Sequence, residues 1–211
     1  MKLDLTAYNA LLPKTAKVLR DLSVQPFLAN FTFVGGSALA LYLKHRQSED
    51  LDFFTWEKEI DKSIIQNTIQ AQFIDFQLIN DSKLQQDWLI EGVKVTFFAN
   101  NWAALQQRNL LENQLYVIDL EVLSAMKVNT LFLRAKYRDY YDLYAIVKSG
   151  VSVQKLYETA VKFLPNMNTK LFQMALVYTD DILEDNINYL YPIYKITKNK
   201  ISAFFQKELV K

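Results

Sequence analysis

The sequence predicts an α+β protein, in which a small mixed β-sheet with flanking helices is followed by an α-helical C-terminal lobe. Up to about residue 100, short runs rich in aromatic and β-branched residues recur between turn residues, as they do in strands. Beyond that point the apolar residues recur at helical spacing, and the strand pattern stops. We therefore expect an α/β core at residues 1–110 and a helical domain at residues 111–211.

The composition narrows the classes of function. With 24 Lys and Arg against 23 Asp and Glu, the formal net charge is +1, which indicates no particular charged partner. The chain has no cysteine, which excludes disulfides and thiolate metal sites and suits a reducing cytoplasm. No apolar run approaches the roughly 20 residues that a membrane-spanning helix needs. We therefore expect a cytoplasmic protein without a membrane partner.

The first predicted elements are two short helices, a strand and a third helix. Apolar residues at helical spacing over residues 3–22 predict the first two helices, with a break at Pro13. Aromatic and β-branched side chains over residues 26–34 predict a strand that ends in a tight turn at residues 35–36. Strong helix formers over residues 37–44 predict the third helix.

The rest of the predicted core is a strand, a helix and three further strands. A polar loop precedes a short strand at residues 50–55, and Asp61 is placed to cap a helix over residues 62–72. The later strands are predicted at residues 73–79, 88–90 and 93–98, the last two joined as a hairpin around Glu91 and Gly92.

The predicted helical domain contains capping residues at suitable intervals. Asp119 suits the start of one helix, and Gly150 suits the end of the next. Ser152 suits the start of a third helix, which Pro165 ends. The tail that begins at residue 197 is amphipathic and predicts a terminal helix.

The turn at Gly35, Gly36 and Ser37 is the first candidate site. A strand that runs into a helix there would expose backbone N–H groups at the positive end of the helix, which suits a phosphate. Glycine allows a phosphate to approach the backbone closely, and Ser37 adds a hydroxyl. The alternative is a turn and helix start that bind no ligand.

Asp50 and Asp52 form the second candidate site. Residues two apart in a strand project to the same side, so both carboxylates are expected together while Leu51 and Phe53 face the core. Two close carboxylates repel unless a cation lies between them. Mg²⁺ typically binds one or two carboxylates and completes its shell with substrate phosphates. The alternative is a solvated acidic strand end, but the glycine turn upstream favours a metal site.

These residues resemble a known motif. Gly36-Ser37 followed by Asp50-Leu51-Asp52 is similar to the first motif of the AbiEii/AbiGii toxin family, which belongs to the DNA polymerase beta-like nucleotidyltransferases. A second match follows in the predicted helical domain, at Ala125-Met126-Lys127, Arg134 and the segment KYRDYYDLY with Asp139 and Asp142. The resemblance covers residues 31–55 and 118–147, and it implies that the predicted sheet is a nucleotidyltransferase core.

The resemblance also implies a reaction and its partners. It implies an enzyme that uses Mg²⁺ or Mn²⁺ to move a nucleotide from an NTP to an acceptor, most plausibly RNA such as tRNA. Such an enzyme is the toxin of a toxin–antitoxin or abortive-infection system, and a cognate antitoxin protein is a possible partner. The implied metal ligands are Asp50 and Asp52, the nucleotide-binding residues are Gly35, Gly36, Ser37, Arg46, Lys127 and Arg134, and the catalytic residues are Asp50, Asp52, Lys127, Asp139 and Asp142.

The second motif has its own physical interpretation. If residues 127–142 form one helix, Lys127, Arg134, Arg138 and Asp142 lie close to one face, which suits phosphate binding with Lys127 as the direct contact. The alternatives are a surface helix with an Arg138–Asp142 pair, or a break between two helices in this stretch. Nearby tyrosines at positions 137, 141 and 144 either stack on a base or pack against the other lobe.

One position departs from the motif. Nucleotidyltransferases of this fold commonly carry a third carboxylate on a later strand, and the in-register position of the predicted strand 93–98 holds Thr96. Asp139 or Asp142, and after them Asp75, are the candidate substitutes. Two alternatives therefore stay open: a catalytically impaired module that binds nucleotide or protein, and an enzyme that modifies a protein or a small molecule such as an aminoglycoside.

The loop before the acidic strand contains the only histidine, His45, and Arg46. His45 has no second His or Cys with which to build a metal site. In the family that the motifs resemble, a His-Arg pair precedes the acidic strand, which implies that His45 orients this loop. Arg46 has three comparable uses: a pair with Asp50, a pair with Asp52, or a phosphate contact.

Overall fold

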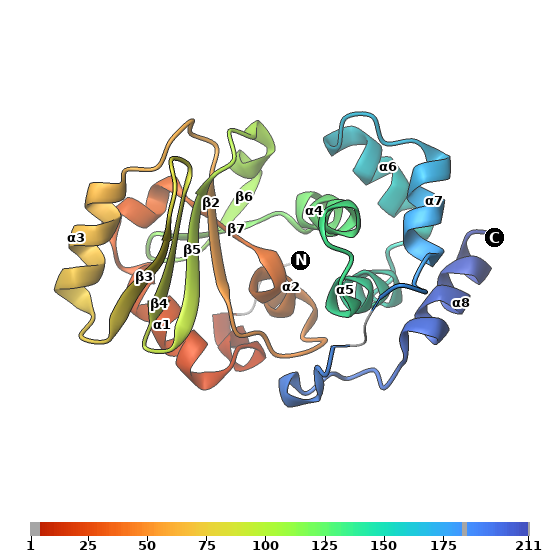
Figure 1. Cartoon of the computed structure of the whole chain (residues 1–211), viewed down its shortest axis with the longest axis horizontal. Helices are drawn as coiled ribbons and strands as arrows, with labels where there is room; N and C mark the ends of the chain where they lie inside the picture. Colours follow the sequence, from red (N-terminus) through yellow and green to blue (C-terminus); the bar gives the residue numbers. More distant parts are fainter. Residues whose placement is uncertain (1–4, 183–184, 211) are drawn as a thin grey trace. The chain divides into compact units, whose positions relative to one another are not determined.

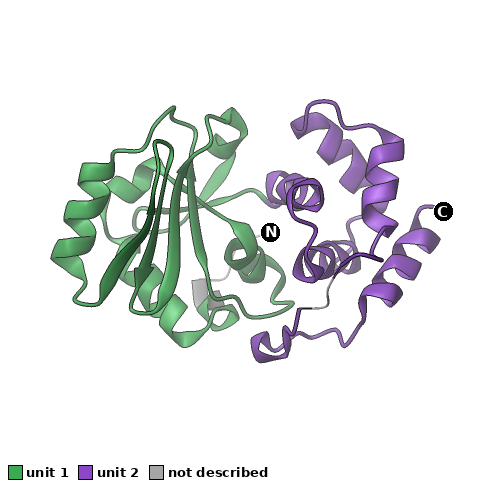
Figure 2. Cartoon of the chain, viewed as in Figure 1, with its two compact units in different colours: residues 1–119 green, residues 120–211 purple. Residues whose placement is uncertain are grey.

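The computed structural model describes residues 5–182 and 185–210. The chain divides into two compact units, unit 1 at residues 1–119 and unit 2 at residues 120–211 (Figures 1 and 2). The predicted boundary at residues 110/111 falls inside a strand, β6 (Arg108–Glu112).

Unit 1 contains a mixed seven-stranded sheet, as the predicted fold class requires. The strand order is β3-β4-β5-β2-β1-β7-β6. Strands β2 and β5 pair in parallel, as do β1 and β7, and the other neighbours are antiparallel. The bounds are β1 (Thr32–Val34), β2 (Leu51–Thr55), β3 (Phe76–Asp81), β4 (Gln85–Ile90), β5 (Val93–Ala99), β6 (Arg108–Glu112) and β7 (Leu115–Ile118).

The predicted strands differ from the observed ones at several points, and β3 begins at Phe76 instead of residue 73. The strand pattern does not stop at residue 100, because β6 and β7 form a hairpin whose β7 pairs with β1. Asn113 makes the turn with a φ of 47°, a left-handed conformation that Asn adopts more readily than most residues. Strand β4 begins at Gln85, three residues before the predicted start, because polar Gln85, Gln86 and Asp87 continue the pairing with β5.

The helices of unit 1 are short. They are η1 (Leu5–Ala10), α1 (Pro13–Ser23), η2 (Pro26–Asn30), α2 (Gly35–Leu43), α3 (Lys62–Gln72) and η3 (Ala103–Gln106), where η marks a 3₁₀ helix. Residues 3 and 4 of the first predicted helix lie outside the described residues. Residues 26–30 form a 3₁₀ helix instead of the start of a strand, since Pro26 suits a first helical position. Asp61 caps α3 as predicted, accepting a hydrogen bond from the Ile64 N–H at 3.0 Å.

The two faces of the sheet differ around β2. Leu51 and Phe53 are fully buried, whereas Asp52 and Phe54 are half-buried, so β2 alternates as predicted. The Phe53 ring stacks on that of Phe97 in β5 at a centroid distance of 5.4 Å, and lies 5.4 Å from that of Phe33 in β1. This aromatic cluster anchors β1, β2 and β5, and the opposite face of the same strands presents Asp52.

Unit 2 is helical, as predicted. Its helices are α4 (Leu120–Leu133), α5 (Tyr137–Lys148), α6 (Val153–Phe163), α7 (Thr169–Val177), η4 (Asn188–Leu190) and α8 (Lys198–Glu208). Ser152 caps α6 as predicted, because its hydroxyl accepts a hydrogen bond from the Lys155 N–H at 3.0 Å. Within residues 5–182 and 185–210, no helix combines the length and the apolar character that crossing a membrane requires.

A single helix over residues 127–142 is wrong, and the alternative of a break is confirmed. Helix α4 ends at Leu133 and α5 begins at Tyr137. Between them Ala135 has a φ of 44°, in the left-handed region that continues no right-handed helix.

Candidate active site

The glycine turn lies where β1 runs into α2 without an intervening loop. Gly35 has a φ of +77°, and the strand before it pairs Val34 with Asp52 of β2. A Cβ at Gly35 would lie 2.2 Å from Asp52 Oδ2, so the carboxylate packs directly against this turn. The N-terminal end of α2, with its backbone N–H groups, therefore lies beside the Asp52 carboxylate.

Arg46 packs against the next glycine. A Cβ at Gly36 would lie 2.8 Å from Arg46 Nη2 and 3.4 Å from Ser48 Oγ. The guanidinium is held by the loop itself, since Nη1 donates to the Gln47 carbonyl oxygen at 2.9 Å. The start of α2 thus has a buried cation beside it, and Arg46 is only 4% exposed.

Ser37 joins α2 to the approach of β2. Its hydroxyl donates a hydrogen bond to the backbone carbonyl oxygen of Asp50, and its side chain is buried. This bond fixes the residue that precedes β2 next to the first turn of α2. The predicted hydroxyl contact with a phosphate stays a prediction.

The loop that carries His45 is fixed by the N-terminal segment. The Leu12 N–H donates to the Ser48 carbonyl oxygen at 3.0 Å, and the Thr15 hydroxyl donates to the Glu49 carbonyl oxygen at 2.9 Å. His45 itself is 1% exposed. Such burial suits the expected role of orienting the loop better than proton exchange with a substrate.

The two predicted metal ligands are Asp50 and Asp52. Asp50 directly precedes β2 and Asp52 lies within it, and both are half-buried. Among the residues that the structure describes, no group of three or more His, Cys, Asp or Glu side chains is arranged to hold a metal ion. Two carboxylates still match what Mg²⁺ commonly takes from a protein when substrate phosphates supply further oxygens, so the residues present fit this ion.

The prediction that Thr96 lies in register with Asp52, where a third carboxylate would be expected, is confirmed. Asp52 of β2 pairs with Thr96 of β5, and Thr96 in turn pairs with Asp87 of β4. The Thr96 hydroxyl donates to Asp87 Oδ1 at 2.7 Å. Asp75, the last of the candidate substitutes, is exposed and lies beside the β4–β5 turn, where its carbonyl oxygen accepts from the Glu91 N–H at 2.8 Å.

Within unit 2 the predicted residues of the second motif gather around one buried cation. Lys127 Nζ of α4 lies 2.6 Å from Asp142 Oδ2 and 3.9 Å from Asp139 Oδ1, both on α5. The Arg134 guanidinium forms a two-point contact with Asp139, at 3.0 Å from Nε and 2.9 Å from Nη2. The Asp139 and Asp142 side chains are 0% exposed, that of Lys127 is 5% exposed and that of Arg134 is 49% exposed.

The break between α4 and α5 produces this cluster in place of the predicted helical face. The turn at residues 134–136 lets side chains of α4 and α5 meet. Asp139 also accepts a hydrogen bond from the Lys136 N–H at 3.2 Å, in the first turn of α5. Arg138 was predicted on the same face, but its Nε lies 3.8 Å from Asp185 Oδ2.

A family model matches residues 17–208, and its description is nucleotidyl transferase AbiEii toxin, type IV toxin–antitoxin system. The chain belongs to this family. Membership confirms the resemblance noted in the sequence and the predicted enzyme class, a nucleotidyltransferase.

Proteins similar to this AbiEii family member match most of its length. An uncharacterised protein of Aquifex aeolicus is 25% identical over 183 residues, which are 85% of this chain and 86% of the relative. A structure of a nucleotidyltransferase described as putative, from Helicobacter pylori, has a TM-score of 0.60 at 18% identity and covers 94% of each chain. MenT4, a nucleotidyltransferase toxin from Mycobacterium tuberculosis, has a TM-score of 0.58 at 15% identity, covering 100% of this chain and 90% of its own. The two solved structures confirm the fold.

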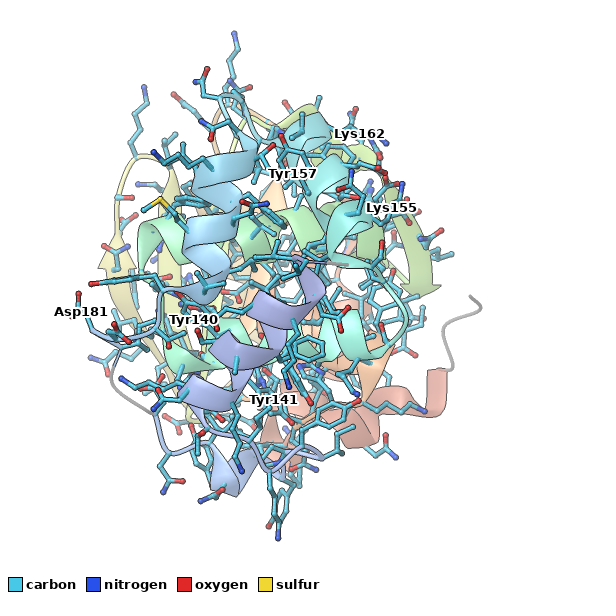
Figure 3. All side chains as sticks on the ribbon, turned by 90° about the vertical axis from the view of Figure 1, so that its right-hand side faces the viewer. Tyr140, Tyr141, Lys155, Tyr157, Lys162 and Asp181 are labelled. Carbon is cyan, nitrogen blue, oxygen red and sulfur yellow. The ribbon has the colours of Figure 1, made fainter. Side chains whose placement is uncertain are left out.

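The tyrosines of α5 pack inside unit 2 of this AbiEii family member. The Tyr137 hydroxyl donates to the Ile196 carbonyl oxygen at 2.5 Å, and the Tyr144 ring lies 4.8 Å from that of Phe204. Tyr140, labelled with Tyr141 in Figure 3, donates to the Tyr178 carbonyl oxygen at 2.7 Å. Burial raises the pKa of Tyr140 to about 12. Tyr137, Tyr141 and Tyr144 therefore make packing contacts whose partners belong to unit 2, instead of the other lobe that was expected.

Gly35→Ala is expected to destabilise this AbiEii family member and to displace the Asp52 carboxylate. An alanine there combines a left-handed backbone with a contact too short to exist, which should cost about 1–3 kcal/mol in the free energy of unfolding. Gly150→Ala is the matched control, since Gly150 has a φ of +107° but nothing within 4 Å of its Cβ position. Denaturant unfolding and nucleotide transfer of both variants check this. Equal stability and equal activity of the two would contradict it.

Proposed function

We propose that this chain is a Mg²⁺-dependent nucleotidyltransferase toxin that moves a nucleotide from an NTP to an RNA acceptor such as tRNA. The observation that carries the proposal is the close approach of the Gly35 turn to Asp52, because the N-terminal end of a helix lies beside one of the two proposed metal-binding carboxylates. A helix N-terminus suits phosphate and a carboxylate pair suits a divalent ion, and an NTP brings both together. Family membership supports the toxin role and a cognate antitoxin as partner. Because NTPs and RNA are cytoplasmic molecules, we expect the protein to act in the cytoplasm.

The residues of unit 1 have distinct proposed roles. The backbone N–H groups at Gly35, Gly36 and Ser37 bind the triphosphate, and the Arg46 guanidinium beside Gly36 adds positive charge there. Asp50 and Asp52 hold the divalent ion, with Mn²⁺ as a substitute for Mg²⁺. When bound, the ion supplies charge stabilisation at the attacked phosphate and the departing pyrophosphate.

The cluster of unit 2 has proposed roles as well. Arg134 is half exposed while it holds Asp139, so it is the member of the cluster best suited to a phosphate contact. Lys127 Nζ, 2.6 Å from Asp142 Oδ2, holds that carboxylate in place as a proposed proton acceptor. In the proposed reaction the acceptor hydroxyl forms a bond to the α-phosphorus, the bond to pyrophosphate breaks, and the hydroxyl proton leaves to Asp142 or Asp139.

Incubation of the purified chain with each α-labelled NTP, Mg²⁺ and total cellular RNA tests the proposal. We expect label from one or more NTPs on a species of tRNA size. Label on protein or on a small molecule would keep the enzyme class and overturn the RNA acceptor. No label from any of the four NTPs, with Mg²⁺ or Mn²⁺ and with RNA, protein and aminoglycoside acceptors present, would favour a module that only binds nucleotide or protein.

A further inference from the structure

A row of three polar residues crosses the sheet of unit 1. The register pairs Asp52 of β2 with Thr96 of β5, and Thr96 with Asp87 of β4. Residues that are directly paired across strands project from the same face of a sheet. Asp87 is therefore on the face that presents Asp52, with Thr96 between them.

The hydrogen bonds around Asp87 orient the Thr96 hydroxyl. Asp87 accepts from Gln85 Nε2 at 2.9 Å at both oxygens and from Asn80 Nδ2 at 3.2 Å. Its Oδ1 lies 2.7 Å from Thr96 Oγ1. Thr96 is the donor of this hydrogen bond, so its single hydroxyl proton points to Asp87 and the oxygen lone pairs point elsewhere.

Distances across the sheet indicate different roles for Thr96 and Asp87. Neighbouring strands lie about 4.8 Å apart, so Thr96 and Asp52 are close enough to contribute oxygens to one small ion. Asp87 is two strands from Asp52, roughly 10 Å away, which is too far for both carboxylates to bind the same ion. Asp87 is also 7% exposed, and neutral donors surround it, an arrangement that carries a desolvation cost.

We propose that Thr96 Oγ1 is the third protein oxygen of the metal site and that Asp87 is the residue that positions it. The proposal rests on the nucleotidyltransferase function proposed above. A hydroxyl oxygen is a hard ligand that suits Mg²⁺, and a carboxylate that accepts its proton makes the oxygen a better donor. Of the three proposed ligands, Asp50 and Asp52 carry one negative charge each and Thr96 carries none. Their total charge therefore balances that of one divalent ion.

The charge balance leads to a defined stoichiometry. If a carboxylate stood in the place of Thr96, the three protein ligands would carry three negative charges, which favours a second divalent ion. With a neutral hydroxyl there, we expect one divalent ion per chain. The ion carried by the NTP phosphates is counted in this number, because it shares the same carboxylates.

Titration of the full chain with Mn²⁺ in the presence of a non-hydrolysable NTP analogue tests the proposal, with free Mn²⁺ followed by electron paramagnetic resonance. Thr96→Val removes the hydroxyl at nearly constant volume, and we expect Mn²⁺ to bind about tenfold more weakly. Thr96→Ser retains the hydroxyl and should bind within about twofold of the parent chain. Asp87→Asn should weaken binding as Thr96→Val does. The double variant should be no weaker than Thr96→Val, because Asp87 acts through Thr96.

Asp52→Asn in the same titration separates this proposal from the proposed function. If Asp52→Asn loses Mn²⁺ binding while Thr96→Val and Asp87→Asn retain it, the role of Thr96 is overturned and the proposed function stands. If Asp52→Asn binds Mn²⁺ like the parent chain, the metal site itself is overturned. Two Mn²⁺ ions per chain would overturn the single-ion site. If thermal melting shows that Thr96→Val is unfolded, Thr96→Ala, which also lacks the hydroxyl, takes its place in the comparison.

Discussion

Asp52→Asn is expected to lower the rate of nucleotide transfer by roughly 1,000-fold, since a bound divalent ion supplies several kcal/mol of charge stabilisation and each 1.36 kcal/mol is a factor of ten. The same change should leave the chain folded. Asn has nearly the volume of Asp, so it fits beside Gly35 as Asp does. Initial rates with the labelled NTP that the parent chain uses, together with thermal unfolding, measure both effects.

Asp81→Asn is the matched control for this prediction. Asp81 ends β3 and forms an exposed pair with Lys62 at 2.8 Å, and Lys62 lowers the pKa of Asp81. Water screens an exposed pair, so its loss has little effect on stability, and this variant should be close to the parent chain in stability and in activity. Transfer by Asp52→Asn at the rate of Asp81→Asn would contradict the assignment of Asp52.

The parts of the fold that the sequence predicts are those in which local chemistry decides the conformation. Asp61 and Ser152 cap the helices they were expected to cap, because an N-cap hydrogen bond spans only three residues. The period-two alternation of β2 separates Asp52 from Phe53 by geometry alone. The placement of Thr96 in register with Asp52 followed from the resemblance to the nucleotidyltransferase fold, and the pairing of β2 with β5 confirms it.

The parts that the sequence does not predict depend on contacts between distant segments. Strand β7 is stabilised by pairing with β1, which lies about 80 residues earlier, and its apolar residues suit a helix equally well. The break at Ala135 was only one of the alternatives that the sequence left open, because no Gly or Pro marks it. Asp87 was missed because a Gln-Gln-Asp run is typical of a loop, and its membership of β4 follows only from pairing with β5. A polar residue inside an otherwise extended run before a hairpin was the available signal.

Lys127→Met is expected to destabilise unit 2 by about 3–5 kcal/mol, because it leaves Asp142 buried without the cation that lies 2.6 Å away. Lys155→Met is the matched control: Lys155 of α6, labelled in Figure 3, is 58% exposed and lies 3.7 Å from Glu121. Its loss should change stability by no more than about 0.5 kcal/mol. Denaturant unfolding followed by far-ultraviolet circular dichroism measures both. All three tryptophans lie in unit 1, so their fluorescence reports on that unit separately.

A double variant separates the structural role of Lys127 from a catalytic one. Lys127→Met combined with Asp142→Asn removes the cation and neutralises the carboxylate, so most of the lost stability should return. If this folded double variant transfers nucleotide at the parental rate, the pair only stabilises unit 2, and its proposed part in proton transfer is wrong. If it is folded but inactive, the pair acts in the reaction as well as in folding. A Lys127→Met chain as stable as Lys155→Met would contradict the buried pair itself.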